Sequence, residues 1–155
     1  MDLILWRHAE AEDSRNDMAR RLTIKGQQQA KSSAQWLHQH LPDNFQVFCS
    51  EAVRAQQTAE FLKQPLTINK LLNPDSHPLN LATFLQQQNA ASSTQIWVGH
   101  QPWIGQFCAY LLNGIWLPQQ FWSVKKSAFW WFDVRFYQQR HQARLKVVLS
   151  PAALK

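Results

Sequence analysis

Short apolar runs alternate with longer segments whose apolar positions recur at helical spacing. The short runs predict strands at 2–6, 45–49, 95–98 and, together with its connection, at 66–72. The longer segments predict helices at 23–40, 50–63, 79–89 and 102–113. Because strands and helices alternate, the pattern indicates an α/β domain, with a mostly parallel central sheet flanked by helices in three layers.

Turn-forming residues separate these elements. Ser50 is expected to cap the helix that follows it, and Pro102 and Gly114 are expected to bound the last helix. The tail predicts a C-terminal β-hairpin, with strands at 127–137 and 143–150 and a polar connection between them. The chain shows no internal repeat and no low-complexity linker, so residues 1–155 are expected to form a single domain.

Composition limits the class of protein. Hydrophobic residues make up 45% of the 155 residues, which argues against disorder, and no apolar run approaches the length of a membrane span. The first residues lack the basic start and cleavage site of a signal peptide, so we expect a cytoplasmic protein. Cys49 and Cys108 lie in apolar stretches, which favours two buried, reduced thiols over the alternative of a disulfide.

The formal net charge of +6 allows a partner that is nucleic acid, an acidic surface or phosphate. The basic residues are scattered, however, and doublets such as Arg20–Arg21 and Lys125–Lys126 are weak signals for nucleic acid. We therefore expect no nucleic-acid partner and no membrane partner, and the oligomeric state is left open.

Three predicted strands end in basic or histidine residues. The first ends at Arg7–His8, the second leads through Ser50 to Arg54, and the fourth ends at Gly99–His100. Ligands of open α/β sheets bind beyond the carboxyl ends of the strands, where helix N-termini also offer free N–H groups to anions. Two arginines and two histidines are thus expected to meet around an anion. The alternative is a set of unrelated, solvated charges.

Four motifs carry a resemblance to a known family. They are RHAEAE at 7–12, R-x-L-T-x-x-G at 20–26, S-x-x-x-R-A-x-Q-T-A at 50–59 and V-G-H-x-P at 98–102. Their order resembles the motif series of the histidine phosphatase superfamily. The short chain is similar to the SixA-like phosphohistidine phosphatase branch of that superfamily.

The resemblance implies roles for five residues. His8 would be the nucleophile that becomes phosphorylated, Arg7 and Arg54 would hold the phosphoryl oxygens, and His100 would be the second histidine. Arg20 would contribute to substrate binding less directly. These types suit the chemistry, because a neutral imidazole is a nucleophile near pH 7 and a guanidinium engages two oxygens at once. No metal or other cofactor is expected.

The chain departs from the family pattern at three positions without losing a catalytic group. Ala9 stands at the usual glycine of the substrate-binding segment and keeps the backbone close, while Glu51 and Arg21 stand at usual prolines. A general acid is not evident, since Asp75, His77, Glu10 and Glu12 are all candidates and none is favoured. A missing acid would fit a phosphohistidine substrate, because an imidazole leaving group needs less help than an alkoxide.

The predicted function is therefore a metal-independent phosphatase whose substrate is a phosphohistidine on a signalling or phosphotransfer protein. Small phosphoesters are the alternative substrates, and a phosphoglycerate mutase is disfavoured because the chain lacks a large inserted lid. A phosphate-binding module without turnover is the rival from another class, and the presence of both histidines argues against it. Several other residues have structural interpretations: Thr58 as a support of the pocket, His38, His40 and His141 as surface residues, and Trp116, Trp122, Trp130 and Trp131 as core.

Overall fold

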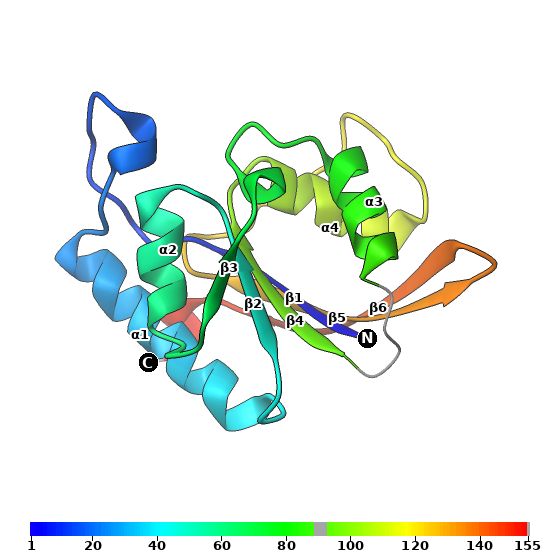
Figure 1. The fold of residues 1–155 in the computed structure, drawn as a ribbon, viewed down its shortest axis with the longest axis horizontal. Helices are drawn as coiled ribbons and strands as arrows, with labels where there is room; N and C mark the ends of the chain where they lie inside the picture. The colour runs from blue at the N-terminus through cyan, green and yellow to red at the C-terminus, as the bar shows by residue number, and fades with distance from the viewer. Residues whose placement is uncertain (89–92, 155) are drawn as a thin grey trace.

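The computed structural model describes residues 1–88 and 93–154, which build a six-stranded mixed sheet (Figure 1). The strand order is β3-β2-β4-β1-β5-β6. The strands are β1 (Asp2–Arg7), β2 (Gln46–Cys49), β3 (Leu66–Ile68), β4 (Thr94–Gly99), β5 (Phe129–Tyr137) and β6 (Arg140–Leu149). The first four are parallel, and β5 and β6 form an antiparallel hairpin beside β1. The mostly parallel sheet and the C-terminal hairpin are thus confirmed.

Helices cover both faces of the sheet, which gives the three predicted layers. They are α1 (Ile24–His40), α2 (Val53–Glu60), α3 (Pro78–Gln87) and α4 (Trp103–Asn113), with 3₁₀ turns η1 (Asp17–Ala19), η2 (Lys70–Leu72) and η3 (Pro151–Leu154). In Figure 1, α1 and α2 lie on the opposite side of the sheet from α3 and α4. None of the described helices combines the length and the apolar character needed to cross a membrane.

Residues 3–6 of β1 are all apolar, and the two covered faces of the sheet explain why. Leu3 and Leu5 join the core beneath α3 and α4, whereas Ile4 and Trp6 join the core beneath α1 and α2. Successive side chains of a strand point to opposite faces, so a strand covered on both faces needs apolar residues throughout.

All four helices differ from their predicted bounds: α1 and α4 begin one residue late, and α2 and α3 differ by more. Helix α2 starts at Val53, and its N-cap is Ala52 and not the predicted Ser50, whose hydroxyl oxygen accepts from the Ala52 N–H and bonds to a histidine ring. It ends at Glu60, three residues early, before a left-handed residue at Lys63 (φ 54°). For the helix predicted at 79–89, α3 begins at Pro78, and residue 89 lies outside the described residues.

The connection of the hairpin is shorter than the predicted one at 138–142. Only Gln138 and Gln139 form the turn, both with positive φ (49° and 66°), and Tyr137 pairs directly with Arg140. Two left-handed residues make the tight turn whose twist matches a hairpin. Residues 140–142 are polar because β6 is an edge strand with little buried surface.

The prediction that four tryptophans lie in the core is confirmed for the two in β5 and is wrong for the two in the loop before it. Trp130 and Trp131 are buried in β5, while Trp122 is 52% exposed and Trp116 is half-buried against the ring of His77. Residues 115–128 between α4 and β5 form no helix or strand, so their side chains do not alternate into a core. Cys49 and Cys108 are buried and free, as predicted.

Hydrogen bonds from the R-x-L-T-x-x-G motif hold the start of α1 against the segment that follows β1. The Thr23 hydroxyl caps the helix by accepting from the Gly26 N–H (2.9 Å) and donates to the Glu10 carboxylate (2.8 Å). The Thr23 N–H also donates to the Glu10 carbonyl (3.0 Å). A Cβ atom at Gly26 would lie 2.0 Å from that carbonyl oxygen, so only glycine allows the contact.

This contact predicts the effect of replacing Gly26. In an exposed helix, glycine to alanine would stabilise by about 1 kcal/mol. Here Gly26→Ala should lower the free energy of unfolding by about 1–3 kcal/mol, because the backbone at Glu10 must shift. Urea denaturation measures the change, with Gln27→Ala, an exposed neighbour in α1, as the control that should stay within about 0.5 kcal/mol. A stabilised Gly26→Ala variant would contradict this packing.

Candidate active site

The carboxyl ends of three neighbouring parallel strands bring the predicted residues together. Arg7, the last residue of β1, pairs with Gly99, the last residue of β4, so His8 and His100 follow side by side. The His8 N–H donates to the Gly99 carbonyl (3.0 Å), and the two imidazole rings lie with centroids 5.0 Å apart. Arg54, from the first turn of α2, places its Nε 3.3 Å from His8 Nε2.

The hydrogen bonds of His8 define where its proton lies. Nδ1 is 2.7 Å from the Ala9 carbonyl oxygen, which can only accept, so Nδ1 carries the proton. Nε2 therefore has a lone pair, and it accepts from Arg54 Nε. The ring is 7% exposed, so Nε2 is a nucleophilic atom held in one orientation at the rim of the pocket.

The hydrogen bonds of His100 place its ring proton and its lone pair differently from those of His8 with respect to their partners. Its Nε2 lies 2.7 Å from the Ser50 hydroxyl oxygen, which also accepts from the Ala52 N–H (3.0 Å). Because the Ser50 oxygen already accepts from Ala52, we assign its hydroxyl hydrogen to Nε2, which leaves the ring proton on Nδ1. Nδ1 is buried and has no hydrogen-bond partner among the described residues, so it is a free donor for an anion.

The two arginines differ in how they are held. Arg7 donates from Nη1 to the Val124 carbonyl (2.9 Å), and its buried Nε has no partner among the described residues. Arg54 is 3% exposed and donates from Nη1 to the Asp17 carbonyl (2.7 Å) and from Nη2 to the Asp17 carboxylate (3.1 Å). Both guanidinium groups thus have fixed orientations before any anion arrives.

Burial keeps both histidines neutral. It lowers the pKa of His8 to about 3, and the nearby charges of Arg54 and Arg7 add to this effect against the Ala9 hydrogen bond. Burial also lowers the pKa of His100 to about 2, with His8 and Arg54 as further causes. The positive charge of the pocket at neutral pH therefore comes from arginine, and the imidazoles supply a lone pair and an N–H.

Asp17 is the residue of this site that sequence reasoning missed. Residues 9–21 have no helical periodicity and were expected to be a loop, but η1 within them directs Asp17 at Arg54 and Arg20. Burial tends to raise the pKa of Asp17, but the charge of Arg54 and its hydrogen bond outweigh burial, and the net pKa is lowered. The only local signal was Asn16, a capping residue type that accepts here from the Met18 N–H.

The supporting residues fall into two groups. Arg20 hydrogen-bonds to Asp17 and, through its Nε, to the Glu12 carbonyl (2.7 Å), and its charge helps to lower the pKa of both histidines. Ala9 is fully buried, and its N–H donates to the Thr58 hydroxyl (3.0 Å), which in turn donates to the Arg54 carbonyl (2.8 Å). The structural role predicted for Thr58 is confirmed, since it ties the backbone after His8 to α2.

Two of the four candidate acids have other hydrogen-bond partners, and none of the four hydrogen-bonds to the histidine pair among the described residues. Glu10 is bonded to Thr23 and lies 4.0 Å from Lys126, and His77 caps α3 by accepting from the Leu79 N–H. Glu12 and Asp75 are exposed. Within the part of the chain that the structure describes, no three His, Cys, Asp or Glu residues are grouped to hold a metal ion.

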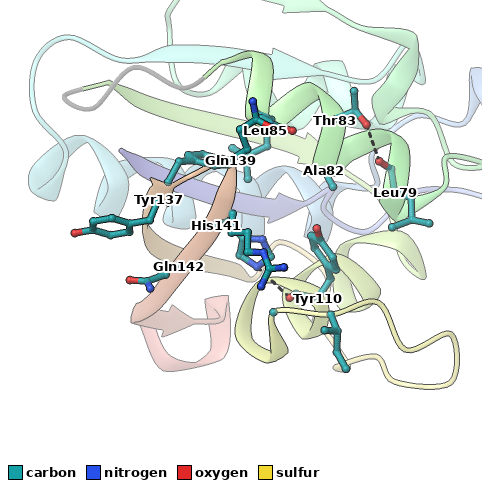
Figure 2. A pocket seen from close by; sticks show the side chains of 14 residues that line it. Leu79, Ala82, Thr83, Leu85, Tyr110, Tyr137, Gln139, His141 and Gln142 are labelled. Carbon is teal, nitrogen blue, oxygen red and sulfur yellow. Dashed lines mark hydrogen bonds between the residues drawn. The ribbon is translucent and has the colours of Figure 1, made fainter.

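A cavity of about 890 Å³ lies elsewhere, between α3, the end of α4 and the tip of the hairpin (Figure 2). His141 lines it with Tyr110 and is half-buried, with Nε2 at 3.1 Å from the Leu111 carbonyl. His141 is therefore partly covered rather than fully exposed, because β6 starts earlier than expected and its ring contacts Tyr110 and the Leu111 carbonyl of α4. His38 and His40 are exposed, as predicted.

Comparisons with known proteins identify relatives of this chain. The family model of the histidine phosphatase superfamily (branch 1) matches residues 3–78. The protein named phosphohistidine phosphatase SixA homolog in Haemophilus influenzae is 32% identical over 127 residues, which cover 72% of this chain and 77% of that protein.

Solved structures show the same fold. The histidine phosphatase SixA in complex with tungstate superimposes with a TM-score of 0.85 over 100% of both chains, at 23% identity. A phosphoserine phosphatase variant from Entamoeba histolytica superimposes with a TM-score of 0.73 over 97% of both chains, at 17% identity.

The fold and the family match together define an α/β phosphatase with one sheet and no inserted lid domain among the described residues. The chain belongs to the histidine phosphatase superfamily, in its SixA-like branch.

The Ser50–His100 bond predicts a tautomer. Ser50→Ala leaves His100 Nε2 buried without a partner, which should lower the free energy of unfolding by about 1–3 kcal/mol. Nitrogen NMR of the His100 ring should place the proton on Nδ1 in the parent protein and on a mixture of both nitrogens in the variant. Ser123→Ala, at an exposed serine, is the control for both measurements. A parent His100 protonated on Nε2 would contradict the assigned hydrogen bonds.

The lowered pKa values of His8 and His100 predict how stability depends on pH. In the unfolded chain both rings take up protons near pH 6.5, whereas in the folded protein they do so only near pH 3 or below. Their contribution to stability is therefore present above pH 6.5 and is lost as the pH falls. His100→Gln should reduce the slope of unfolding free energy between pH 5.5 and 4 by about 1.4 kcal/mol per pH unit. Urea denaturation at several pH values measures the slope, and an unchanged slope would contradict a neutral, buried His100.

Proposed function

We propose that this protein is a metal-independent phosphohistidine phosphatase that acts through a covalent phosphate on His8. The observation that carries the proposal is the pair of neutral, buried imidazoles, one with its lone pair and one with its N–H at the same pocket. Arg7 and Arg54 would hold the phosphoryl oxygens, and Arg20 and the Ala9 backbone would support the binding segment. We take residues 1–155 to be one such domain, working in the cytoplasm.

The first step transfers the phosphoryl group to the enzyme. The lone pair of His8 Nε2 forms a bond to phosphorus while the phosphorus–nitrogen bond of the substrate breaks. The substrate ring is protonated on its other nitrogen, so it leaves as a neutral imidazole. Positive charge develops on the His8 ring, and the Ala9 carbonyl at Nδ1 stabilises it. The guanidinium of Arg54 and the N–H of His100 neutralise charge on the equatorial oxygens.

The second step returns the enzyme to its starting state. A water molecule attacks phosphorus, the bond to His8 Nε2 breaks, and inorganic phosphate leaves. The proton of the water passes to the released phosphate, so His8 is again neutral with its proton on Nδ1. Each step is favoured by the arrangement of charge rather than by an acid, which agrees with the electrostatic character of phosphoryl transfer.

Among the described residues, no carboxyl group hydrogen-bonds to His8 or His100, which favours phosphohistidine over a phosphoester. Asp17 is the carboxylate in contact with Arg54, and its lowered pKa keeps it ionised, so it has no proton to give to an alkoxide. An imidazole leaves without prior protonation by an enzyme group. Small phosphoesters remain the second candidate, because a phosphoserine phosphatase shares the fold. We expect the physiological substrate to be a phosphotransfer protein in signal transduction.

His8→Ala tests the mechanism. The variant should lose at least about 10³-fold in kcat/KM on a phosphohistidine protein and on phosphoramidate, because no other neutral imidazole lone pair faces the phosphoryl site among the described residues. The parent protein, quenched after mixing with labelled phosphodonor, should carry an acid-labile, alkali-stable phosphate on His8. His38→Ala, at an exposed histidine, is the matched control.

Two outcomes would reject the proposal. One is a His8→Ala variant that turns over as fast as the parent, which would remove His8 from the mechanism. The other is a parent protein that binds phosphate but releases no product, as expected of a phosphate-binding module.

A further inference from the structure

A basic groove adjoins the phosphoryl pocket, and the chemistry above leaves it unused. It consists of two cavities, of about 460 and about 400 Å³, which share Gln29, Pro151 and Ala152 and so run into one another. The first is also lined by Arg7, Lys125, Lys126 and Ser150, and the second by Lys25, Gln28 and Ser32. We call the two together the Arg7 groove.

The charge of the Arg7 groove has one sign. Lys25, Lys125 and Lys126 are exposed along it, and no acidic residue is among the described residues that line it. Glu10, 4.0 Å from Lys126, is the nearest counterion in the structure, and its other carboxylate oxygen already accepts from Thr23. The groove is therefore short of negative charge.

Arg7 links the Arg7 groove to the phosphoryl site. Its Nη1 is fixed on the Val124 carbonyl, and its buried Nε has no partner among the described residues. A phosphoryl group on this guanidinium would thus have the rest of its own molecule at the mouth of the groove. A small phosphoester ends at that point, whereas a polypeptide continues.

The lining favours a polypeptide over a nucleic acid. Pro151 and Ala152 give a small apolar floor, and Gln28 and Gln29 offer amides that can bond to a peptide backbone. No aromatic side chain is among the described residues of the lining, so nothing there would stack on a base.

We propose that the Arg7 groove binds an acidic segment of the polypeptide that carries the phosphohistidine, with carboxylates on Lys25, Lys125 and Lys126. This inference rests on the proposed function and adds the substrate's chemistry next to the phosphohistidine. Exposed ion pairs contribute about two- to fivefold each in affinity, so three of them give about tenfold or more.

A matched pair of peptides tests the proposal without any variant. Each contains one phosphohistidine, flanked by glutamates in one peptide and by glutamines in the other. The parent protein should hydrolyse the glutamate peptide with about tenfold higher kcat/KM in about 0.02 M salt, and the preference should largely vanish in about 0.5 M salt. Equal rates at low salt would overturn the inference.

Reversing the charge of two groove lysines then tests whether the preference for the glutamate peptide arises in the Arg7 groove. Lys125→Glu with Lys126→Glu should remove or invert the preference, measured as the ratio of kcat/KM between the two peptides. Lys31→Glu with Lys63→Glu is the matched control, because both lysines are exposed, lie outside the lining and change the net charge equally. An equal loss in both double variants would overturn the assignment to this groove.

Two further measurements separate the possible failures. Phosphoramidate hydrolysis reports on the pocket alone: if neither it nor any peptide is hydrolysed, the proposed function fails with the inference, whereas equal peptide rates with intact phosphoramidate hydrolysis reject the groove alone. A single-stranded DNA competitor that inhibits more strongly than the unphosphorylated glutamate peptide would identify a nucleic-acid occupant and overturn the proposal.

Discussion

The site depends on the parallel register of β1, β4 and β2. Arg7 lies opposite Gly99, and Cys49 lies opposite Val98, so the three strands end together and their next residues emerge at one edge of the sheet. A shift by one residue in any of these pairs would exchange the side chains that face the two cores and would separate the histidines. Both cores of the domain therefore enforce the register on which the pocket relies.

Burial and hydrogen bonding together turn two similar side chains into different groups. His8 donates to a carbonyl and keeps a lone pair on Nε2, whereas His100 accepts from a hydroxyl and keeps its proton on Nδ1. Two charged imidazoles at this distance, beside two arginines, would repel each other strongly in a buried site. Neutral rings avoid that repulsion, so the positive charge of the site comes from the two arginines.

Asp17 shows how the pocket is held in the absence of substrate. Its carbonyl and carboxylate occupy both terminal nitrogens of Arg54, and the same carboxylate holds Arg20. Burial of the Arg54 guanidinium carries a desolvation cost that lowers its pKa, and the charge and hydrogen bond of the largely exposed Asp17 offset part of that cost. The segment between β1 and α1 thus orients an arginine that comes from a different strand–helix unit.

Much of this protein could be predicted from its sequence alone. The uniform apolar run of β1 required a strand covered on both faces, and the placement of Arg7, His8, Arg54 and His100 after strands indicated a shared anion site, because parallel strands end at one edge. What the tertiary structure decided depends on contacts between distant residues: Asp17 on Arg54, the Ser50 hydroxyl diverted from a helix cap to His100, and the ring of His141 on α4. Local sequence patterns predict secondary structure through propensity and periodicity, but they do not predict which distant polar groups will hydrogen-bond in the folded chain. The sequence therefore predicts which residue types form the site. The protonation, orientation and hydrogen-bond partners of these side chains are determined only by the folded structure.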